Sequence, residues 1–559
     1  MNKSFIVPLA AALGMSLASA GSAASLPQSL AGIRDLGIAG ASTRVDVVLV
    51  MNYRNEDQLD RLLEEQTDET SPLYHQFMSQ DQFVNYFAPA PSDYARVIAS
   101  LQRAGFTITQ TWSNRTVIDA VAPAPAAAKY FNTEIHNVVQ PGVGTTYTNV
   151  RPATLPADIA GLATGVVGLS KIKILHPDYV FLPHGANPLG NLGEVGKNGS
   201  PLKGPDGGYG PTVYINSYDL PAANGNTGTG RASGVAGDAD FLDSDLAGYL
   251  SYFGVNRTGP ATVRVLVDGG PPPGNGYGDS VETALDVETV VSLAPGTALY
   301  VYETKPSATL EYFIDMYNKV VKDNKVDTLN TSYSQCETAF EPSFPKLAEK
   351  VEKQGAAEGI SFHASAGDDG VYTYGCESTV SVGTPTDTQH NISVGGTILD
   401  INSNGDETSE VAWNDSSGAT GGGVSTVIKL PSWQKGVANV IKGGRNLPDI
   451  AYDASPYTGE SYYYGGRWEG PIGGTSLSSP IFGASLTEID QLHKSRAGYF
   501  NPVLYKTWDQ NGYSKGSTVY IRDITQGSDP PYKAQVGYDQ MTGLGAGLAN
   551  NLSGILPKK

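Results

Sequence analysis

The chain has 559 residues, of which 40% are apolar and 17% are charged, and its formal net charge at pH 7 is −19. At roughly 150 residues per domain, this length exceeds one ordinary unit and leaves room for a large core. The acidic balance, with no basic cluster that stands out, argues against nucleic acid as a partner.

The first 24 residues are typical of a secretory signal peptide. Lys3 supplies the positive start, a short apolar stretch follows, and Ala18 and Ala20 form an A-x-A cleavage site. The alternative is an N-terminal membrane anchor, but the stretch is short for a span and is interrupted by Pro8. We therefore expect a secreted monomer, extracellular or periplasmic, with no membrane partner.

Two cysteines occur in the sequence, Cys336 and Cys376. In an exported protein such a pair suggests one disulfide, and the alternative is two free buried thiols. A bridge over this separation would stabilise the fold by roughly 4 kcal/mol through loop entropy.

Residues 25–181 form the first compositional unit. Strand-like runs alternate there with helix-like runs such as "DQLDRLLEEQT" and "SDYARVIASLQRAG", whose apolar residues recur three and four positions apart. This pattern predicts a compact α+β domain. Residues 182–211 are then dominated by Gly, Pro and Asn. They predict an exposed linker, where proteolytic nicking concentrates.

Residues 212–559 form the second unit. β-Branched runs such as "ATVRVLV" and "NISVGGTIL" alternate with helical stretches such as "SVETALDVETVVSLA". The alternation predicts an α/β fold with a mostly parallel sheet flanked by helices. In such sheets, functional sites form at the carboxyl ends of the strands.

The segment "PIGGTSLSSPIFGASLTEIDQL" contains a candidate nucleophile, Ser476. The Gly-Gly-Thr sequence before it allows close backbone approach, and we expect a helix to begin here with Pro480 in its first turn. Unpaired N–H groups at a helix N-terminus suit developing negative charge. The alternative is a serine-rich helix cap.

A serine nucleophile needs a base, which is usually a histidine. The histidines beyond the linker are His363, His390 and His493, and none has the His-Gly-Thr context of a subtilisin-like enzyme. Either the serine is inert or another kind of base serves.

Two carboxylates supply such a base. Glu282 and Asp286 are four residues apart in a largely apolar helical stretch, so they lie on one helix face. Because neighbouring carboxylates repel, one of them tends to hold a proton. Glu282 could accept the serine proton while Asp286 orients it. The alternative is a solvated acidic face, and Glu288 is a third acid that we expect to face elsewhere.

A further acid lies in "FHASAGDDGVY", where Asp368 and Asp369 follow a β-run. A protonated Asp at this strand end could donate a hydrogen bond to an oxyanion. The local sequence does not choose between the two.

Near the C-terminus, Asp523 and Asp539 bracket a loop rich in Gly and Pro. Carboxylates together with loop carbonyls suit a hard cation, calcium above all. The alternative is an ordinary acidic surface loop.

Together these segments resemble the sedolisin family of serine-carboxyl peptidases, the kumamolisin-like and tripeptidyl-peptidase-like group. "SPLYHQFMSQDQFVNYFAP" looks like the family's activation propeptide, and "ETALDVETVVSLAPG" resembles its Glu-x-x-x-Asp helix. "ASAGDDG" resembles its oxyanion segment, "GGTSLSSP" its nucleophile segment and "DITQG…GYDQMTGLG" its calcium loop. The order of these segments is more specific than any one of them.

The resemblance implies a subtilisin-like fold in which Ser476 is the nucleophile, Glu282 the general base, Asp286 its supporter and Asp368 the oxyanion donor. It also implies one structural calcium ion. The implied ligands are the side chains of Asp523 and Asp539 and the carbonyls of Ile524, Gln535 and Gly537.

The sequence departs from the family in two places. Many members have Gly at the position of Gln535, a change that a carbonyl ligand tolerates. Some members extend the acid network with a Glu and a Trp, where this chain has Asp238 and Tyr333. Because of the second departure, the pH optimum of other family members cannot be transferred in detail to this chain.

The expected function is a secreted, acid-acting endopeptidase that hydrolyses polypeptides through an acyl-enzyme on Ser476. We expect it to mature by cutting itself between about 182 and 211, with the propeptide serving first as inhibitor and folding aid. The alternatives are a tripeptidyl-peptidase-type exopeptidase, a histidine-dependent subtilisin-like enzyme and an inactive secreted calcium-binding relative.

Overall fold

The computed structural model describes residues 32–173, 175–183, 195–196, 199–276, 278–306, 309–339, 341, 343–376, 378–511, 514–515 and 518–556. The predicted signal peptide lies outside these residues, as do residues 184–194 of the predicted linker. Among the described helices, none is long and apolar enough to cross a membrane.

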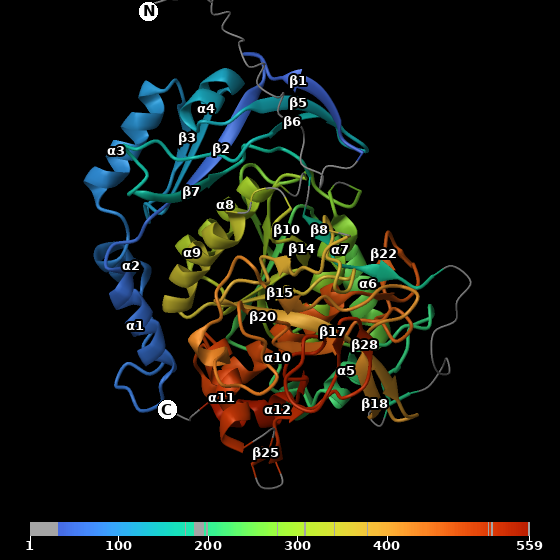
Figure 1. Cartoon of the computed structure of the whole chain (residues 1–559). Coiled ribbons are helices and arrows are strands. Elements are labelled where there is room, and N and C mark those ends of the chain that lie inside the picture. Colours follow the sequence, from blue (N-terminus) through green and yellow to red (C-terminus); the bar gives the residue numbers. More distant parts are fainter. Residues whose placement is uncertain are drawn as a thin grey trace, which may run out of the picture.

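The N-terminal domain is built on two antiparallel sheets (Figure 1). The larger has the order β3 (Thr107–Thr111), β4 (Val117–Pro123), β2 (Arg44–Met51) and β7 (Ala163–Val167), and the smaller β1 (Arg34–Ile38), β5 (Ile135–Gln140) and β6 (Gly144–Asn149). The helices are α1 (Glu56–Thr67), α2 (Gln80–Tyr86), α3 (Pro91–Arg103) and α4 (Ala124–Tyr130). The prediction of an α+β domain is confirmed.

The second domain is built around an eight-stranded sheet. Its order is β11 (Val263–Leu266), β12 (Ala298–Glu303), β10 (Ala232–Gly237), β13 (Thr328–Thr331), β15 (Ser361–Ser365), β17 (Asn391–Ile401) and β18 (Glu407–Ala412), with β21 (Ile450–Asp453) beside β17. All pairs are parallel except β17 with β18. The predicted α/β fold with a mostly parallel sheet is confirmed.

Two pairs of helices cover the two faces of this sheet. Adjacent side chains of a strand point to opposite faces. Val235 of β10 lies in one core with α7 (Ser280–Leu293) and α10 (Thr475–His493). The next residue, Ala236, lies in another core with α8 (Leu310–Asp323) and α9 (Phe344–Ala357). Helix α10 also packs directly on α7, and this contact positions the candidate catalytic residues.

The remaining elements surround this frame. The helices are α5 (Pro211–Ser217), α6 (Asp243–Phe253), α11 (Asn501–Asn511) and α12 (Ala549–Leu552). The short strands are β16 (Gly383–Thr384), β19 (Gly423–Val424), β20 (Asn446–Leu447), β22 (Tyr463–Tyr464), β23 (Arg467–Trp468), β25 (Ser514–Lys515), β26 (Thr518–Val519), β27 (Ile521–Arg522), β28 (Ser528–Asp529), β29 (Tyr532–Lys533) and β30 (Ala546–Gly547).

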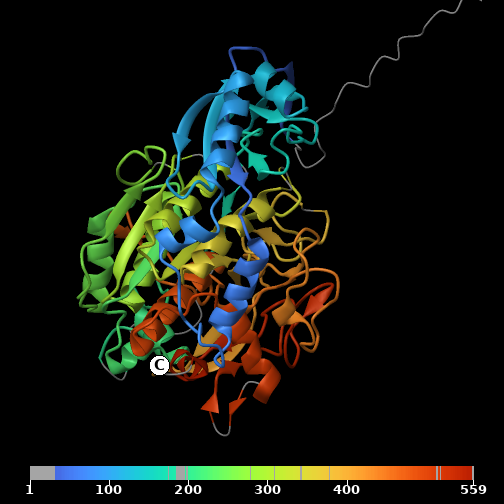
Figure 2. The same ribbon diagram turned by 90° about the vertical axis from the view of Figure 1, so that its left-hand side faces the viewer.

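The N-terminal domain packs on the face formed by α8 and α9. Strand β2 contacts α8, and both β7 and α1 contact α9. Figure 2 shows α1 running down the side of the second domain, away from the rest of its own domain. The N-terminal domain therefore holds the second domain by a sheet and by a separate helix.

The end of the N-terminal domain continues across the second domain as an extended segment. Strand β8 (His176–Pro177) pairs antiparallel with β14 (Tyr333–Cys336), and β9 (Val180–Phe181) pairs antiparallel with β24 (Ile472–Gly473). The segment between the two domains is therefore built into the fold up to residue 182, whose N–H donates to the carbonyl of Pro471 at 3.0 Å.

The prediction of an exposed linker over 182–211 is wrong for its C-terminal part. Leu202 and Tyr209 are buried, and the N–H of Gly204 donates to Ser461 Oγ at 2.9 Å. A Cβ on Gly208 would lie 2.4 Å from the backbone nitrogen of Ser461. Glycine therefore serves close packing here, whereas composition alone indicated flexibility.

Cys336 and Cys376 form a disulfide, which confirms that prediction. The bond joins the end of β14 to the loop that follows β15, the loop that also contains Asp368 and Asp369.

Candidate active site

Ser476 is the second residue of α10 and its side chain is fully buried. The helix follows Gly474, whose φ of 101° lies in the left-handed region that favours glycine. Pro480 lies in the second turn and not, as expected, in the first. Because proline lacks an N–H, it leaves the carbonyl of Ser476 without its usual intrahelical donor.

The hydroxyl of Ser476 faces a carboxyl group. Ser476 Oγ donates to Glu282 Oε2 at 2.8 Å and also lies 3.3 Å from the carbonyl oxygen of Ser332. Glu282 is in the first turn of α7, so the packing of α7 on α10 brings the two side chains together. The structure thus unites the predicted nucleophile and the predicted base.

Asp286 lies one turn further along α7, where Ser332 Oγ donates to its Oδ1 at 2.7 Å. Burial raises the pKa of both acids, and the charge of Asp286 raises that of Glu282 further. The second oxygens, Glu282 Oε1 and Asp286 Oδ2, are buried without a hydrogen-bond partner among the described residues. One proton held between these two carboxyl groups would satisfy both oxygens.

Asp368 lies at the other side of Ser476, in the loop after β15. Its Oδ1 accepts hydrogen bonds from Thr475 N at 2.7 Å and Thr475 Oγ1 at 2.8 Å, while Oδ2 is buried without a partner in the part of the chain described. Burial, and then the charge of Asp178, raise the pKa of Asp368 well above its usual range. Oδ2 is thus the oxygen that would carry a proton. Asp369 is exposed and does not share this position.

The peptide carbonyl of Asp178 occupies the space between these groups. The N–H of Ser476 donates to this oxygen at 2.8 Å. A Cβ on Gly474 would lie 2.2 Å from the same oxygen and 2.4 Å from Asp368 Oδ2. The carbonyl oxygen of Asp178 and Asp368 Oδ2 therefore lie near each other beside Gly474. A carbonyl so placed is where an oxyanion would develop. Sequence reasoning missed Asp178, which carries no motif.

The histidines of the second domain lie elsewhere. His363 Nδ1 contacts Ser479 Oγ at 3.0 Å, and burial lowers the pKa of His363 to about 3. His390 pairs with Glu349, and His493 Nε2 lies 2.8 Å from the carbonyl oxygen of Ser553. The acceptor at Ser476 Oγ is therefore a carboxylate and not an imidazole.

Two further acids, Glu288 of α7 and Asp238 after β10, have hydrogen-bond partners of their own. Glu288 Oε2 accepts from the N–H of Tyr463 at 3.2 Å, so this acid faces away from Ser476 as expected. Asp238 Oδ1 accepts from Tyr333 Oη at 3.3 Å, and burial followed by the charge of Asp279 raises the pKa of Asp238 to about 6. Asp238 and Tyr333 are thus hydrogen-bonded to each other.

The C-terminal loop brings Asp523 and Asp539 together. Asp523 Oδ2 accepts from the N–H of Gly537 at 3.1 Å, and Asp539 Oδ2 accepts from the N–H of Gln535 at 3.0 Å. Burial raises the pKa of both acids, that of Asp539 to about 6, and neither pairs with a described Lys, Arg or His. No described cluster of three or more His, Cys, Asp or Glu could hold a metal, so an ion here would need carbonyl ligands.

Comparison with known proteins agrees with this arrangement. The family model "Pro-kumamolisin, activation domain" matches residues 31–172, and the model "Subtilase family" matches residues 270–519. The chain is 29% identical to Sedolisin of Pseudomonas sp. (strain 101), over 90% of this chain and 86% of that protein. It is 28% identical to Kumamolisin of Bacillus sp. (strain MN-32), over 94% of each, and 24% identical to Tripeptidyl-peptidase 1 of Homo sapiens, over 84% of each.

One solved structure extends the comparison to the fold. The structure titled "Pseudomonas sedolisin (serine-carboxyl proteinase) complexed with two molecules of pseudo-iodotyrostatin" superposes with a TM-score of 0.56 at 28% identity, covering 63% of this chain and 98% of that one. The chain therefore belongs to the sedolisin family of serine peptidases, with a pro-kumamolisin-type activation domain ahead of a subtilisin-like peptidase domain.

Proposed function

We propose that this peptidase is a secreted, acid-acting serine-carboxyl endopeptidase that cuts polypeptides through an acyl-enzyme on Ser476. The observation that carries the proposal is the 2.8 Å hydrogen bond from Ser476 Oγ to Glu282 Oε2, made between fully buried side chains. When the acceptor of a serine hydroxyl is a buried carboxylate, this carboxylate can act as the base only at pH values at which it is ionised.

Proton transfer follows from the geometry of the pair. As Ser476 Oγ attacks a peptide carbonyl carbon, its proton passes to Glu282 Oε2, 2.8 Å away. Asp286 shares a proton with Glu282 and is itself oriented by Ser332 Oγ. Glu282 then returns the proton to the departing amine, and water hydrolyses the ester through the same base.

Two donors would stabilise the oxyanion. The N–H of Ser476 at the start of α10 is one, and the protonated Oδ2 of Asp368 is the other. A deprotonated Asp368 would repel the developing charge instead. The raised pKa of Asp368, caused by burial and by Asp178, keeps the donor form available in acid, and this supports an acid-acting enzyme.

The path of the chain through the site supports internal cleavage. The extended segment of residues 176–182, called the crossing segment below, pairs with β14 before Asp178 and with β24 after it. The chain continues beyond both pairings. A cleft that holds a chain on both sides of the reacting bond suits an endopeptidase. A tripeptidyl exopeptidase would need the cleft to close three residues before that bond.

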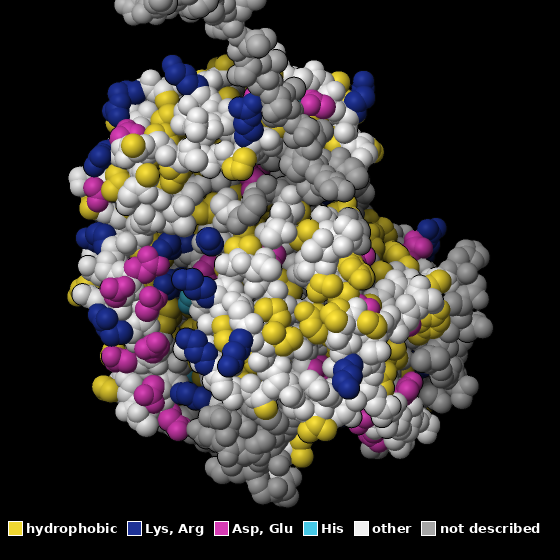
Figure 3. Space-filling model, in the orientation of Figure 1, with side chains coloured by type: hydrophobic (Ala, Val, Ile, Leu, Met, Phe, Trp, Pro, Cys, Tyr) yellow, Lys and Arg dark blue, Asp and Glu magenta, His cyan; other side chains and the backbone are white. Residues whose placement is uncertain are grey.

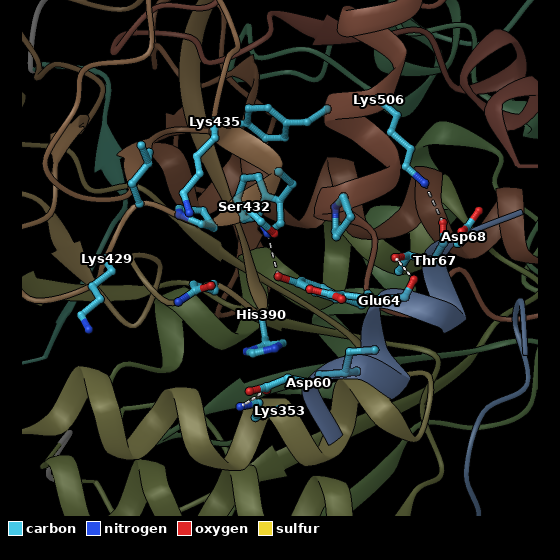
Figure 4. A pocket seen from close by; sticks show the side chains of 18 of the residues that line it. Asp60, Glu64, Thr67, Asp68, Lys353, His390, Lys429, Ser432, Lys435 and Lys506 are labelled. Carbon is cyan, nitrogen blue, oxygen red and sulfur yellow. Dashed lines mark hydrogen bonds and ion pairs between the residues drawn. The ribbon is translucent and has the colours of Figure 1, made fainter. Parts of the chain in front are cut away.

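The activation domain is held by charged contacts, consistent with an intramolecular inhibitor. Figure 3 shows acidic side chains over α1 facing a row of Lys and Arg on the neighbouring surface. Glu56 of α1 binds Lys350 at 2.6 Å and Lys353 at 3.1 Å, and Asp60 also pairs with Lys353. A cavity of about 770 Å³ opens beside these pairs, with Lys506 reaching the carbonyl of Thr67 at its far end (Figure 4).

A calcium ion is the further component that the loop would accept. The donor set fits a hard cation because Asp523 and Asp539 are close together, partly or largely buried and without a cationic partner among the described residues. The carbonyls of Ile524, Gln535 and Gly537 would complete the shell. A bound ion would join the two ends of this loop and stabilise the peptidase domain.

The proposed function is tested by the hydrolysis of an unfolded protein between about pH 3 and pH 8, with Ser476→Ala beside the wild type. We expect internal fragments in acid from the wild type and none from Ser476→Ala. Products consisting only of N-terminal tripeptides would identify an exopeptidase, and equal hydrolysis by both proteins would refute the role of Ser476.

A further inference from the structure

The crossing segment presents one particular peptide bond to the nucleophile. The carbonyl oxygen of Asp178 accepts from the N–H of Ser476 at 2.8 Å, and the N–H of Asp178 donates to the carbonyl of Ser332 at 3.1 Å. The pairings with β14 and β24 fix the chain on either side. The bond that follows this carbonyl is Asp178–Tyr179.

We infer that Asp178–Tyr179 is the bond that the precursor cuts first, and that the pocket for the residue before the cut selects a short acid in its uncharged form, or the matching amide. The inference rests on the proposed role of Ser476. It differs from the cut between 182 and 211 expected from composition, because the bond held at Ser476 lies before that stretch.

The pocket that receives Asp178 is lined by two hydroxyl groups. Ser334 Oγ donates to Asp178 Oδ1 at 2.8 Å, and Ser365 Oγ donates to Asp178 Oδ2 at 2.6 Å. All three side chains are buried, Asp178 being 3% exposed. A hydroxyl both donates and accepts, so the pair matches a carboxylic acid or a carboxamide. A hydrocarbon side chain would leave two buried hydroxyls unpaired.

Burial and the neighbouring acids together disfavour an ionised Asp178 and outweigh the hydrogen bonds of Ser365 and Ser334, which lower its pKa. Burial, and then the charge of Asp369, raise the pKa of Asp178 to about 7. Asp368 in the same loop and Glu282 on α7 are also acids that interact with the charge of Asp178. The side chain of Asp178 is therefore uncharged in acid, and it binds without adding a negative charge next to Asp368, Asp369 and Glu282.

The cut balances as an acyl transfer followed by hydrolysis. Ser476 Oγ bonds to the carbonyl carbon of Asp178 while its proton moves to Glu282. The bond to Tyr179 breaks, and the nitrogen of Tyr179 takes that proton as it leaves. Water then splits the ester, which leaves a carboxyl terminus on Asp178 and restores the Ser476 hydroxyl.

The first test follows the full-length precursor after acidification, by intact mass and N-terminal sequencing at the earliest times. We expect a fragment that ends at Asp178 and one that begins at Tyr179. Asp178→Asn should be cut at the same bond, whereas Asp178→Leu should slow that cut on the order of 100-fold, because its pocket hydroxyls lose their partners. Asp81→Leu, at an exposed acid of α2, should mature like the wild type.

The outcomes separate the inference from the function on which it rests. Maturation of Ser476→Ala at the wild-type rate would overturn the proposed self-processing. Maturation that requires Ser476 but starts with another bond, or an Asp178→Leu precursor cut at residue 178 as fast as wild type, would overturn the inference alone.

A second test needs no altered precursor and uses the mature enzyme with three peptides that differ only before the cut: Asp, Asn or Leu. At about pH 4 we expect the Asp and Asn peptides to exceed the Leu peptide in kcat/KM by on the order of 100-fold. As pH rises toward 7, kcat/KM for the Asp peptide should fall relative to kcat/KM for the other two peptides. Ser365→Ala should lower the ratio of kcat/KM for the Asn peptide to that for the Leu peptide. A preference for Leu would overturn the pocket assignment.

Discussion

Ser476 Oγ and Glu282 Oε2 lie 2.8 Å apart although 194 residues separate them in the chain. The contact depends on the packing of α10 against α7. Both side chains are fully buried, and no described Lys, Arg or His pairs with Glu282.

Replacing Glu282 tests the base. Gln keeps the size of the side chain but cannot take a proton, so we expect Glu282→Gln to lower kcat/KM by about 10³-fold or more. Glu288→Gln is the matched control, because Glu288 is a buried acid of the same helix that faces Tyr463. Its activity should stay within a few fold of wild type. Equal losses in the two variants would point to damage of α7 and not to a base.

The ion pairs of α1 predict how acid loosens the activation domain. Burial would raise the pKa of Glu56, but the hydrogen bonds and charges of Lys350 and Lys353 outweigh burial and lower it. A lowered pKa means that this contact stabilises the precursor above the ordinary range of a glutamate and is lost as pH falls through the lowered value. Glu56→Gln should therefore mature at a higher pH than wild type.

The maturation of the Glu56 variant is measured by gel or mass after incubation across a pH series. Asp57→Asn is the control, because Asp57 is exposed on the same helix turn. An unchanged pH dependence for Glu56→Gln would show that these pairs do not hold the activation domain.

A buried acid pair acts in the opposite direction. Asp119 of β4 and Asp315 of α8 are buried acids at the domain interface, each with one oxygen that has no hydrogen-bond partner among the described residues. Burial raises the pKa of Asp119 to about 7, and burial followed by the charge of Asp119 raises that of Asp315. A raised pKa means that the pair stabilises the precursor below the ordinary range of an aspartate and that this is lost as pH rises through about 7. In a Ser476→Ala background, Asp119→Asn should flatten the fall in Tm between about pH 4 and pH 7, which is the range between the unfolded and folded pKa values of Asp119. A fall as steep as that of the parent would contradict this account.

The calcium proposal predicts a thermal response to chelation. An ion that binds only the folded state stabilises it by about 2.7 kcal/mol at a hundred times its Kd. A chelator should therefore lower the Tm by a few degrees, and Asp523→Ala should abolish this response. Asp529→Ala is a control in the same loop, since Asp529 bonds to the N–H of Val371 and should keep the response. A stripped wild type with an unchanged Tm would rule out a stabilising ion.

Much of the fold and part of the site could be predicted from the sequence, because local patterns determine them. The spacing of Glu282 and Asp286 places both on one helix face, and the predicted start of a helix at Ser476 agrees with α10. The choice of Asp368 over Asp369 was not available locally, because it depends on which side chain turns toward Thr475.

The features that sequence reasoning missed depend on distant contacts. Asp178 acquires its position from pairing with strands about 150 and 300 residues further along the chain, and no local motif records such pairing. The composition of the stretch before α5 predicts a linker, because Gly and Pro are typical both of a flexible chain and of close backbone packing. Only the neighbouring Ser461 distinguishes the two.

The pH dependence of the mature enzyme tests the central claim, that carboxyl groups alone move the proton and stabilise the oxyanion. Glu282 must accept a proton while Asp368 must carry one, and burial raises the pKa of both. We expect kcat/KM to follow a bell centred in acid whose limbs belong to the coupled acids, with Asp368→Asn losing the alkaline limb of whatever activity remains. A histidine base would instead gain activity as pH rises through about 6.5. Full activity of the wild type at about pH 8, with little at about pH 4, would contradict the carboxylate mechanism.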